Sequence, residues 1–376
     1  MAQDSYTVVT RQSWGQRLKG AFAGIVVGLG LVALCFVMLF WNEGRAVERR
    51  KTLEEGAGAV VSVSADRVDP AREGALVHLS GRADTGETLT DDTFGVSAPA
   101  LRLERKVEMY QWQEHEESTT DKKVGGGSET TTTYTYETAW SDSPVDSSRF
   151  ARSEGHENPG SFPWSQREVT AERVSLGGYR LSPGLVGKIE RWQPLALSSL
   201  DPLPEDLRER ARLHDGGLYF GDGAPASPKV GDVRVAFRVV EPTDVSVVAQ
   251  QTGDTFRPFA AEAGGTIELL ELGTVNADQM FAAAQRRNTL FTWGLRLAGF
   301  LLMAMGFAMV LRPLSVAADV LPFLGSLVGA GTGFVAFLLA GFFSLVTIAM
   351  AWIFYRPLLG GALLALAVVA VVWLVR

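Results

Sequence analysis

The chain contains very little cysteine and histidine, which limits the chemistry that it can carry. Of its 376 residues, one is cysteine and four are histidine. The single thiol, Cys35, lies inside a long apolar run, so an internal disulfide and a cysteine-based metal site are both excluded. The histidines are neither adjacent nor four residues apart: His78, His115, His156 and His214. The stretch "EHEE" around His115 therefore lacks the second imidazole of the H-E-x-x-H zinc motif, and we expect His115 in a solvated polar loop.

Recognisable catalytic motifs are missing as well. There is no G-x-S-x-G nucleophile elbow, and the three glycines at 125–127 are not followed by the G-K-[ST] of a phosphate-binding loop. The formal net charge of -7 argues against a nucleic-acid partner, because binding phosphates needs clustered Lys and Arg. We therefore expect no catalytic residues, no cofactor, no metal site and no enzyme activity.

Charge is missing from a long run near the start of the chain. Residues 21–41 are uncharged, and at about 1.5 Å per residue they cross a hydrocarbon core of about 30 Å. A cleavable signal peptide has a shorter apolar region followed by small residues, whereas here bulky Trp41 leads into Asn42 and Glu43. We predict a short N-terminal tail (1–19) and a retained transmembrane helix over 20–42, with Trp41 at the membrane interface.

The C-terminal part repeats this pattern. Asn276 followed by Gln279 predicts a capped helix over 276–311 that leads into a second span. Residues 312–329 are expected to form an interfacial or re-entrant segment, followed by a third span over 330–355 and a fourth over 357–375. The one charge inside the second span is Arg296, which we expect to extend to the interface, the alternatives being a buried pair or an ion pathway. Residues predicted at the membrane interface are Trp41, Arg296, Pro322, Phe323, Tyr355 and Arg356.

Between the first and second spans, residues 45–275 have the composition of a water-soluble domain. Alternating and β-branched stretches predict strands at 59–63, 75–79, 101–112, 131–140, 233–240, 245–250 and 267–272. The stretches 101–112 and 131–140 are expected to form a long antiparallel hairpin with opposed aromatic residues. A helix is expected from Pro204. The predicted fold class is therefore an α+β membrane protein with a large, mostly antiparallel β-rich extramembrane domain.

Glycines recur every fourth residue in two apolar regions. Small residues at this spacing let helix backbones approach closely, which drives association in lipid, although glycine is also common in membrane helices generally. The predicted helix-packing or assembly positions are Gly20, Gly24, Gly28, Gly325, Gly329 and Gly333. Whether the helix that packs against them belongs to the same chain or to a second copy is left open.

Several stretches resemble the transmembrane protein 43 family, also called LUMA. The stretches occur in order between about residues 39 and 358, and include "LFWNEGRAV" (39–47), "LRLERKVEMYQWQE" (101–114), "VSVVAQQTGDTFRPF" (245–259) and "FSLVTIAMAWIFYRPL" (343–358). The resemblance implies one early span, a large domain and a group of C-terminal spans. It also implies membrane-protein scaffolding and self-association without an established enzymatic activity.

The resemblance places the large domain on the lumenal side of the endoplasmic reticulum and inner nuclear membrane in animals. We take the chain to be a prokaryotic member, so the same topology puts the domain in the periplasm, at the bacterial inner membrane. The distribution of Lys and Arg by itself slightly favours a cytoplasmic domain, but large domains translocate largely regardless of charge.

The leading hypothesis is a non-catalytic membrane scaffold that self-associates and presents its β-rich domain to membrane lipids and unidentified membrane proteins. Trp112, Tyr134 and Tyr136 are candidates for an exposed aromatic face, the alternative being structural strands. A second hypothesis is a membrane-interface enzyme or sensor acting on lipid, with Arg296 and Asp319 near the interface. That hypothesis predicts a polar pocket at the membrane surface with converging titratable groups.

Overall fold

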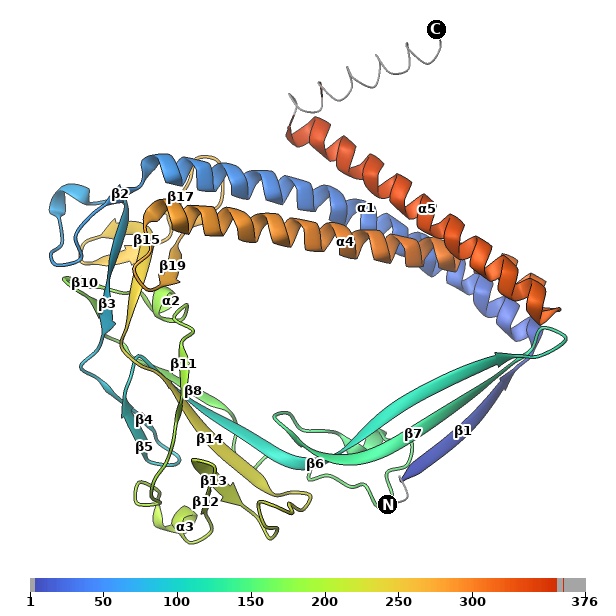
Figure 1. Cartoon of the computed structure of the whole chain (residues 1–376), viewed down its shortest axis with the longest axis horizontal. Helices are drawn as coiled ribbons and strands as arrows, with labels where there is room; N and C mark the ends of the chain where they lie inside the picture. Colours follow the sequence, from blue (N-terminus) through green and yellow to red (C-terminus); the bar gives the residue numbers. More distant parts are fainter. Residues whose placement is uncertain (1–3, 357–360, 362–376) are drawn as a thin grey trace.

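The computed structural model describes residues 4–356 and residue 361, and it confirms the predicted α+β fold class. Two long helices lie side by side, a third crosses them near one end, and a β-rich domain lies at the other end (Figure 1). Within the described residues, three helices are long and apolar enough to cross a membrane, one near the N-terminus and two near the C-terminus. The predicted fourth span, 357–375, lies outside the described residues apart from residue 361.

Helix α1 (Trp14–Ala59) contains the predicted first span but is twice as long. Ser13 caps it, accepting a hydrogen bond from the Gln16 backbone, and the Gln16 side chain accepts one from the Ser13 backbone in return. The helix does not end near Trp41 as predicted. No proline interrupts residues 42–59, and the change from lipid to water does not itself end a helix. The extramembrane domain therefore begins with about four further helical turns rather than with a strand.

Helices α4 (Ala277–Ala318) and α5 (Pro322–Tyr355) carry the later spans. Asn276 caps α4 by accepting a hydrogen bond from the Gln279 backbone, and the helix continues through the second span as predicted. Residues 312–329, predicted as a separate interfacial or re-entrant segment, are instead divided between two helices. Helix α4 runs on to Ala318, and α5 begins at Pro322 after three intervening residues. Pro313 lies inside α4, a position that membrane helices tolerate.

The middle of the chain forms two main sheets, mostly antiparallel. The eight-stranded sheet has the order β1-β7-β6-β14-β13-β12, with β8 on β6 and β11 on β14. Its strands are β1 (Ser5–Gln12), β6 (Arg102–Lys122), β7 (Ser128–Ser141), β8 (Arg167–Thr170), β11 (Trp192–Leu195), β12 (Arg212–His214), β13 (Gly217–Phe220) and β14 (Val233–Val240). The predicted hairpin is confirmed, with Tyr110 opposite Trp140 and their ring centroids 5.3 Å apart.

The second sheet has seven strands in the order β10-β9-β3-β15-β16, with β19 on β15 and β2 on β3. Its strands are β2 (Val61–Ser62), β3 (Leu76–Asp84), β9 (Ser175–Leu176), β10 (Tyr179–Arg180), β15 (Thr243–Thr252), β16 (Thr255–Arg257) and β19 (Leu269–Leu272). Two small sheets pair β4 (Thr88–Asp91) with β5 (Val96–Pro99) and β17 (Phe259–Ala260) with β18 (Thr266–Ile267). The short helices are α2 (Pro183–Val186) and α3 (Glu205–Arg208), with 3-10 turns at Pro70–Arg72 and Ser147–Arg149.

Two sequence predictions in this domain need correction. The helix from Pro204 is only the four-residue α3, because Arg212 already starts strand β12. The polar stretch after Trp112 is not a loop: β6 continues to Lys122 and β7 begins at Ser128. His115 therefore lies within β6, where its Nε2 is 2.8 Å from Oε1 of Glu137 on β7. A run of Thr and Glu is compatible with an extended strand exposed on both faces.

The distal half of the β6–β7 hairpin, together with β1, forms a three-stranded extension that we call the arm (residues 5–12 and 113–137). The arm leaves the β domain, lies apart from α1 and α4 over most of its length, and meets them again at the start of α1 (Figure 1). Strand β1 forms the edge of this sheet, with its register running from Ser5 opposite Thr135 to Gln12 opposite Ser128. This strand comes from the segment predicted to be a plain N-terminal tail.

Among the described residues, three apolar clusters hold the fold together. The largest packs the two main sheets around residues such as Phe94, Leu103 and Phe237. A second cluster joins the helices to the domain through Leu53 of α1 and Phe281 of α4. A third lies between the spans and contains Val32, Cys35, Leu39, Met303 and Ala340. The helices and the β domain are thus packed into one continuous body.

Candidate functional site

A buried ion pair ties the three long helices together just beyond the apolar run of α1. Oε1 of Glu43 accepts a hydrogen bond from Nε of Arg296 at 2.6 Å, and Oε2 accepts one from Nη2 at 2.8 Å. Trp352 of α5 donates its indole N–H to Oε2 at 2.8 Å. The Glu43 side chain is 0% exposed and that of Arg296 is 13% exposed. Arg296 therefore forms the buried pair that was the alternative to a side chain extending freely to the interface, and its depth in a bilayer stays a prediction.

Polar side chains on α1 and α4 continue this contact toward the β domain. Asn42 donates to the carbonyl of Thr292 at 3.1 Å, and Arg45 donates to the Thr292 hydroxyl at 2.9 Å and to Asn288 Oδ1 at 3.1 Å. The Arg45 guanidinium also lies 4.6 Å from the ring centroid of Phe291. In a low-dielectric setting such satisfied hydrogen bonds fix the rotation of one helix against the other.

The sequence did hold a signal for this polar contact. Residues 42, 45, 49 and 52 of α1 and residues 288, 292 and 296 of α4 are polar and recur at three- or four-residue spacing, which places each set on one helix face. Glu43 was overlooked because it follows the apolar run directly and resembles an ordinary water-facing charge.

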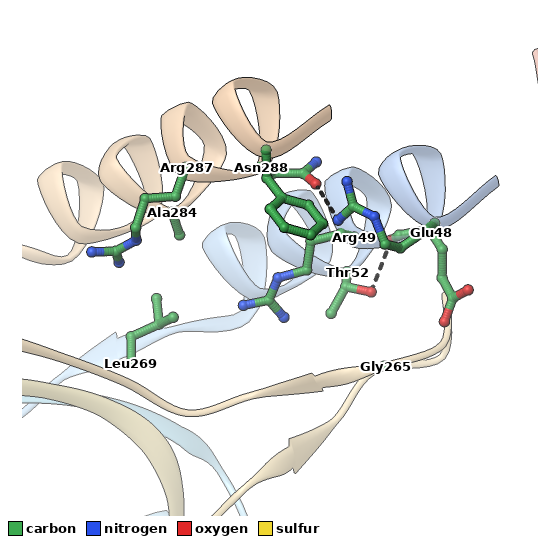
Figure 2. A pocket seen from close by; sticks show the side chains of 10 residues that line it. Glu48, Arg49, Thr52, Gly265, Leu269, Ala284, Arg287 and Asn288 are labelled. Atoms are coloured by element: carbon green, nitrogen blue, oxygen red, sulfur yellow. Dashed lines mark hydrogen bonds between the residues drawn. The ribbon is translucent and has the colours of Figure 1, made fainter. Parts of the chain in front are cut away.

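An open pocket of about 500 Å³ adjoins this polar contact, between α1, α4 and β19. Figure 2 shows α1 and α4 side by side, with Arg49 and Arg287 extending from them toward the strand that carries Leu269. The wall contains three arginines, one carboxylate and an apolar side formed mainly by Phe291 and Leu269. The lining residues are Arg45, Glu48, Arg49, Thr52, Gly265, Leu269, Ala284, Arg287, Asn288 and Phe291.

The arginines of the pocket influence one another. Burial lowers the pKa of Arg49, and the nearby positive charges of Arg287 and Arg45 lower it further. Arg49 donates to the carbonyl of Thr266 at 2.6 Å, and Arg287 lies 2.7 Å from a carboxylate oxygen of Glu271. The pocket therefore concentrates positive charge eight residues past Trp41, which suits it to an anion.

A second polar cluster closes the arm onto the opposite end of the helices. Asp319, whose side chain is 1% exposed, lies between Arg17 of α1 at 2.5 Å and Lys122 of the arm at 2.7 Å. Gly125 donates its backbone N–H to the carbonyl of Val320 at 3.1 Å. Gly126 adopts a positive φ of 82° and packs directly against the Trp14 ring, a position that no larger residue can take without a shift.

Arg296 and Asp319, which the lipid-enzyme hypothesis placed together, lie at opposite ends of the apolar part of α4. They are 23 positions apart in one continuous helix, or about 35 Å at the usual helical rise. They therefore cannot form one acid–base site. The titratable group that lies against Arg296 is Glu43.

The glycines predicted for assembly divide into three groups. Gly28 packs inside the chain, since a Cβ there would lie 2.6 Å from the carbonyl oxygen of Gly306 on α4. Gly24 and Gly329 approach Met309 and Ser315 more loosely, and Gly325 packs tightly against Asp319. Gly20 and Gly333 have no other atom within 4 Å of an added Cβ in the described structure. Some glycines of each series therefore pack against other parts of the same copy.

The residues predicted at the membrane interface have varied surroundings. Trp41 and Phe323 are exposed, the latter by 77%. Tyr355 packs near Phe40, with ring centroids 5.2 Å apart, and lies against Gly44. The Arg356 guanidinium lies 5.8 Å from the Trp352 ring centroid, and Pro322 opens α5. Their depth in a bilayer stays a prediction.

The predicted exposed aromatic face is largely used within the molecule. The rings of Tyr136 and His156 stack at 3.9 Å, and Trp112 meets His156 edge-on at 4.7 Å. Burial and a hydrogen bond to Glu114 raise the pKa of Tyr136 to about 12. Tyr134 stacks on Tyr6 of β1 at 6.3 Å. The aromatic side chains of these strands therefore pack within the molecule, which agrees with the alternative that the strands are structural.

Three long apolar helices, joined by a buried ion pair and packed against a β-rich domain, define an integral membrane protein. The chain belongs to the transmembrane protein 43 family. The model of this family, described as Transmembrane protein 43, matches residues 109–357. Transmembrane protein 43 of Rattus norvegicus is 37% identical over 368 residues, covering 95% of this chain and 90% of the relative.

Other relatives agree with this assignment. Transmembrane protein 43 of Homo sapiens is 37% identical over 367 residues, covering 95% of this chain and 90% of its own length. The Transmembrane protein 43 homolog of Drosophila melanogaster is 32% identical over 349 residues, covering 90% of each chain. No solved structure matches.

Proposed function

We propose that this protein is a non-catalytic membrane scaffold that self-associates and presents its β-rich domain to membrane lipids and other membrane proteins. The observation that carries the proposal is the arm, a polar sheet that leaves the β domain and meets the helices again at the start of α1 (Figure 1). In our proposal the membrane is the bacterial inner membrane and the domain is periplasmic, as the family resemblance implies for a prokaryotic member.

The helices present apolar side chains outward, as a lipid-facing surface requires. Phe22, Val26 and Val37 of α1 are 56%, 75% and 67% exposed. The stretch from Trp14 to Trp41 is about 40 Å long at the usual helical rise, enough to cross a hydrocarbon core of about 30 Å.

The arm has the opposite character. From His115 to Lys122 every residue of β6 is exposed, and these include Glu116, Glu117 and Asp121. Strand β1 is an edge strand, whose outer N–H and C=O groups need partners. Neither charged side chains nor an open sheet edge is tolerated against lipid.

Because the arm is fixed to the β domain at one end and to Asp319 at the other, it passes the same depth as the spans. It therefore needs water or protein beside it. Several copies that turn their helices outward and their arms inward provide both, and the edge of β1 offers backbone groups for pairing with a neighbouring copy. Gly20 and Gly333, which have open space beside them, are available for contact between spans.

Particle mass and cross-linking test this arrangement. In a Cys35→Ala background, the full chain with Thr119→Cys on the arm is reconstituted in nanodiscs and treated with a short bis-maleimide. We expect more than one copy per particle and efficient cross-links between arms. The matched variant Val26→Cys, on the lipid-facing side of α1, should cross-link much less. One copy per particle at all protein concentrations, or stronger cross-linking at Val26→Cys, would refute the proposal.

A further inference from the structure

We propose that the pocket between α1, α4 and β19 binds the phosphate group of an anionic phospholipid. Nothing in the family assignment specifies a ligand for this pocket. The inference does not depend on self-association, because all the lining residues come from one chain.

The charge of the pocket favours an anion. Its wall contains three guanidinium groups, from Arg45, Arg49 and Arg287, and one carboxylate, from Glu48. Burial lowers the pKa of Arg49, and repulsion from Arg287 and Arg45 lowers it further. That repulsion is relieved when a negative group lies between the arginines. Guanidinium groups also match phosphate oxygens geometrically, since two parallel N–H groups can bind two oxygens.

Arg45 is held rigidly in the wall. Nε of Arg45 is buried and has no hydrogen-bond partner within the described residues, although its two Nη groups are bonded to Asn42, Asn288 and Thr292. Leaving a buried charged donor without a partner is costly. The Arg45 side chain is held in place by these hydrogen bonds and lines the pocket, so it contributes a fixed positive charge to the wall, whereas its buried Nε is closed to a ligand.

The depth of the pocket fits a lipid headgroup. The side of the pocket nearest the membrane is at Arg45, four residues or about 6 Å beyond the apolar run, and Arg49 is about 12 Å beyond it. The interfacial region of a bilayer leaflet is about 5–8 Å thick, so the phosphate is expected nearest Arg45. Phe291 forms one wall, and exposed Leu290 lies next to it on α4. These apolar side chains lead from the arginines toward the lipid-facing part of α4, where an acyl chain can lie. A free phosphate ion would gain nothing from them.

Binding of short-chain lipids tests the proposal, and a comparison with inorganic phosphate tests whether the bound phosphate belongs to a lipid. The full-length protein in uncharged detergent is titrated by calorimetry with dihexanoylphosphatidic acid, dihexanoylphosphatidylcholine and inorganic phosphate. We expect one site per chain for the phosphatidic acid, with the other two probes at least about tenfold weaker. The double variant Arg49→Gln/Arg287→Gln should weaken phosphatidic acid binding at least about tenfold, because it removes two charge-assisted contacts.

The matched control is Arg50→Gln/Arg286→Gln, which removes the same charge from the adjacent positions of the same helices, outside the pocket. Its affinity should stay within about twofold of wild type. Equal weakening in both double variants, or none in the pocket variant, would refute the site, and inorganic phosphate binding as tightly as the lipid would refute the lipid assignment. If the double variant does not fold, the single variants Arg287→Gln and Arg286→Gln make the same comparison.

Discussion

Glu43 and Arg296, which are 253 positions apart in the chain, face each other as a two-point ion pair in which each carboxylate oxygen accepts one guanidinium N–H. Trp352 adds a third donor from α5, so this carboxylate is the point at which all three described spans meet. A buried charge is tolerated only when its partner is present. The stability of the helix bundle should therefore depend on both residues together.

Arg296→Met is expected to destabilise the protein by about 3–5 kcal/mol, because it leaves the buried Glu43 carboxylate without a cation. Adding Glu43→Gln in the same chain should recover much of this loss, since the amide is neutral and can still accept from Trp352. Denaturant unfolding in mild detergent measures both free energies. A cost below about 1 kcal/mol for the single variant, typical of an exposed pair, would contradict the burial of this contact.

Asp319→Asn is expected to release the tip of the arm, because it weakens the ion pairs with Arg17 and Lys122. Cleavage by trypsin at Lys122 and Lys123 should become at least about tenfold faster, as expected for losing charge-assisted hydrogen bonds. Asp222→Asn, which changes an exposed carboxylate in the loop before β14 rather than at the tip of the arm, serves as the control and should leave the rate unchanged. Equal rates in the two variants would show that Asp319 does not hold the arm.

Gly28→Ala should destabilise the bundle by about 1–3 kcal/mol, because its new methyl group would meet the Gly306 carbonyl of α4. Gly30→Ala, two positions away with open space around it, should be neutral or slightly stabilising. Thermal unfolding of the two variants in detergent gives the comparison. If Gly28→Ala changed the number of copies per particle without changing stability, Gly28 would serve assembly rather than packing within the chain.

Acid should loosen the edge strand of the arm. A side-chain hydrogen bond from Arg11 of β1, with a further contribution from Lys123, lowers the pKa of Glu129 below its usual range. Because the folded-state pKa is depressed, this contact stabilises the attachment of β1 above pH about 4.3 and is lost as pH falls through the lowered value. Hydrogen exchange of residues 5–12, corrected for the intrinsic effect of pH, should show protection falling in this acidic range.

Glu129→Gln should reduce that protection at neutral pH and remove its acid dependence. Glu117→Gln, on the exposed strand β6, is the matched carboxylate control and should behave like the wild type. If the pH dependence of hydrogen-exchange protection in residues 5–12 were unchanged in Glu129→Gln, the loss of protection in acid would come from other groups.

Local patterns were enough to predict much of this fold. The apolar runs gave the three described spans, and the alternation of aromatic residues around Tyr110 and Trp140 gave the central hairpin. The cap at Asn276 gave the start of α4. Each of these features depends on residues that are close in sequence or on the solvent around a single helix.

The contacts that the sequence did not predict are non-local. Strand β1 pairs with a strand more than 110 residues away, and its own composition does not distinguish it from a tail. Glu43 meets Arg296 only because α1 and α4 pack with one particular rotation. The pocket arginines were visible as charges, but their convergence depends on that same rotation and on the position of β19.

The unbroken course of α1 from Trp14 to Ala59 makes it a rigid lever between the bilayer and the β domain. About 18 residues, or about 27 Å of helix, extend past Trp41, so a 10° change in tilt moves the far end by about 5 Å. Helices change tilt when the hydrocarbon thickness around them changes. Because α4 is fixed to α1 at both Glu43 and Leu53, membrane thinning or thickening will displace the whole domain rather than bend a linker.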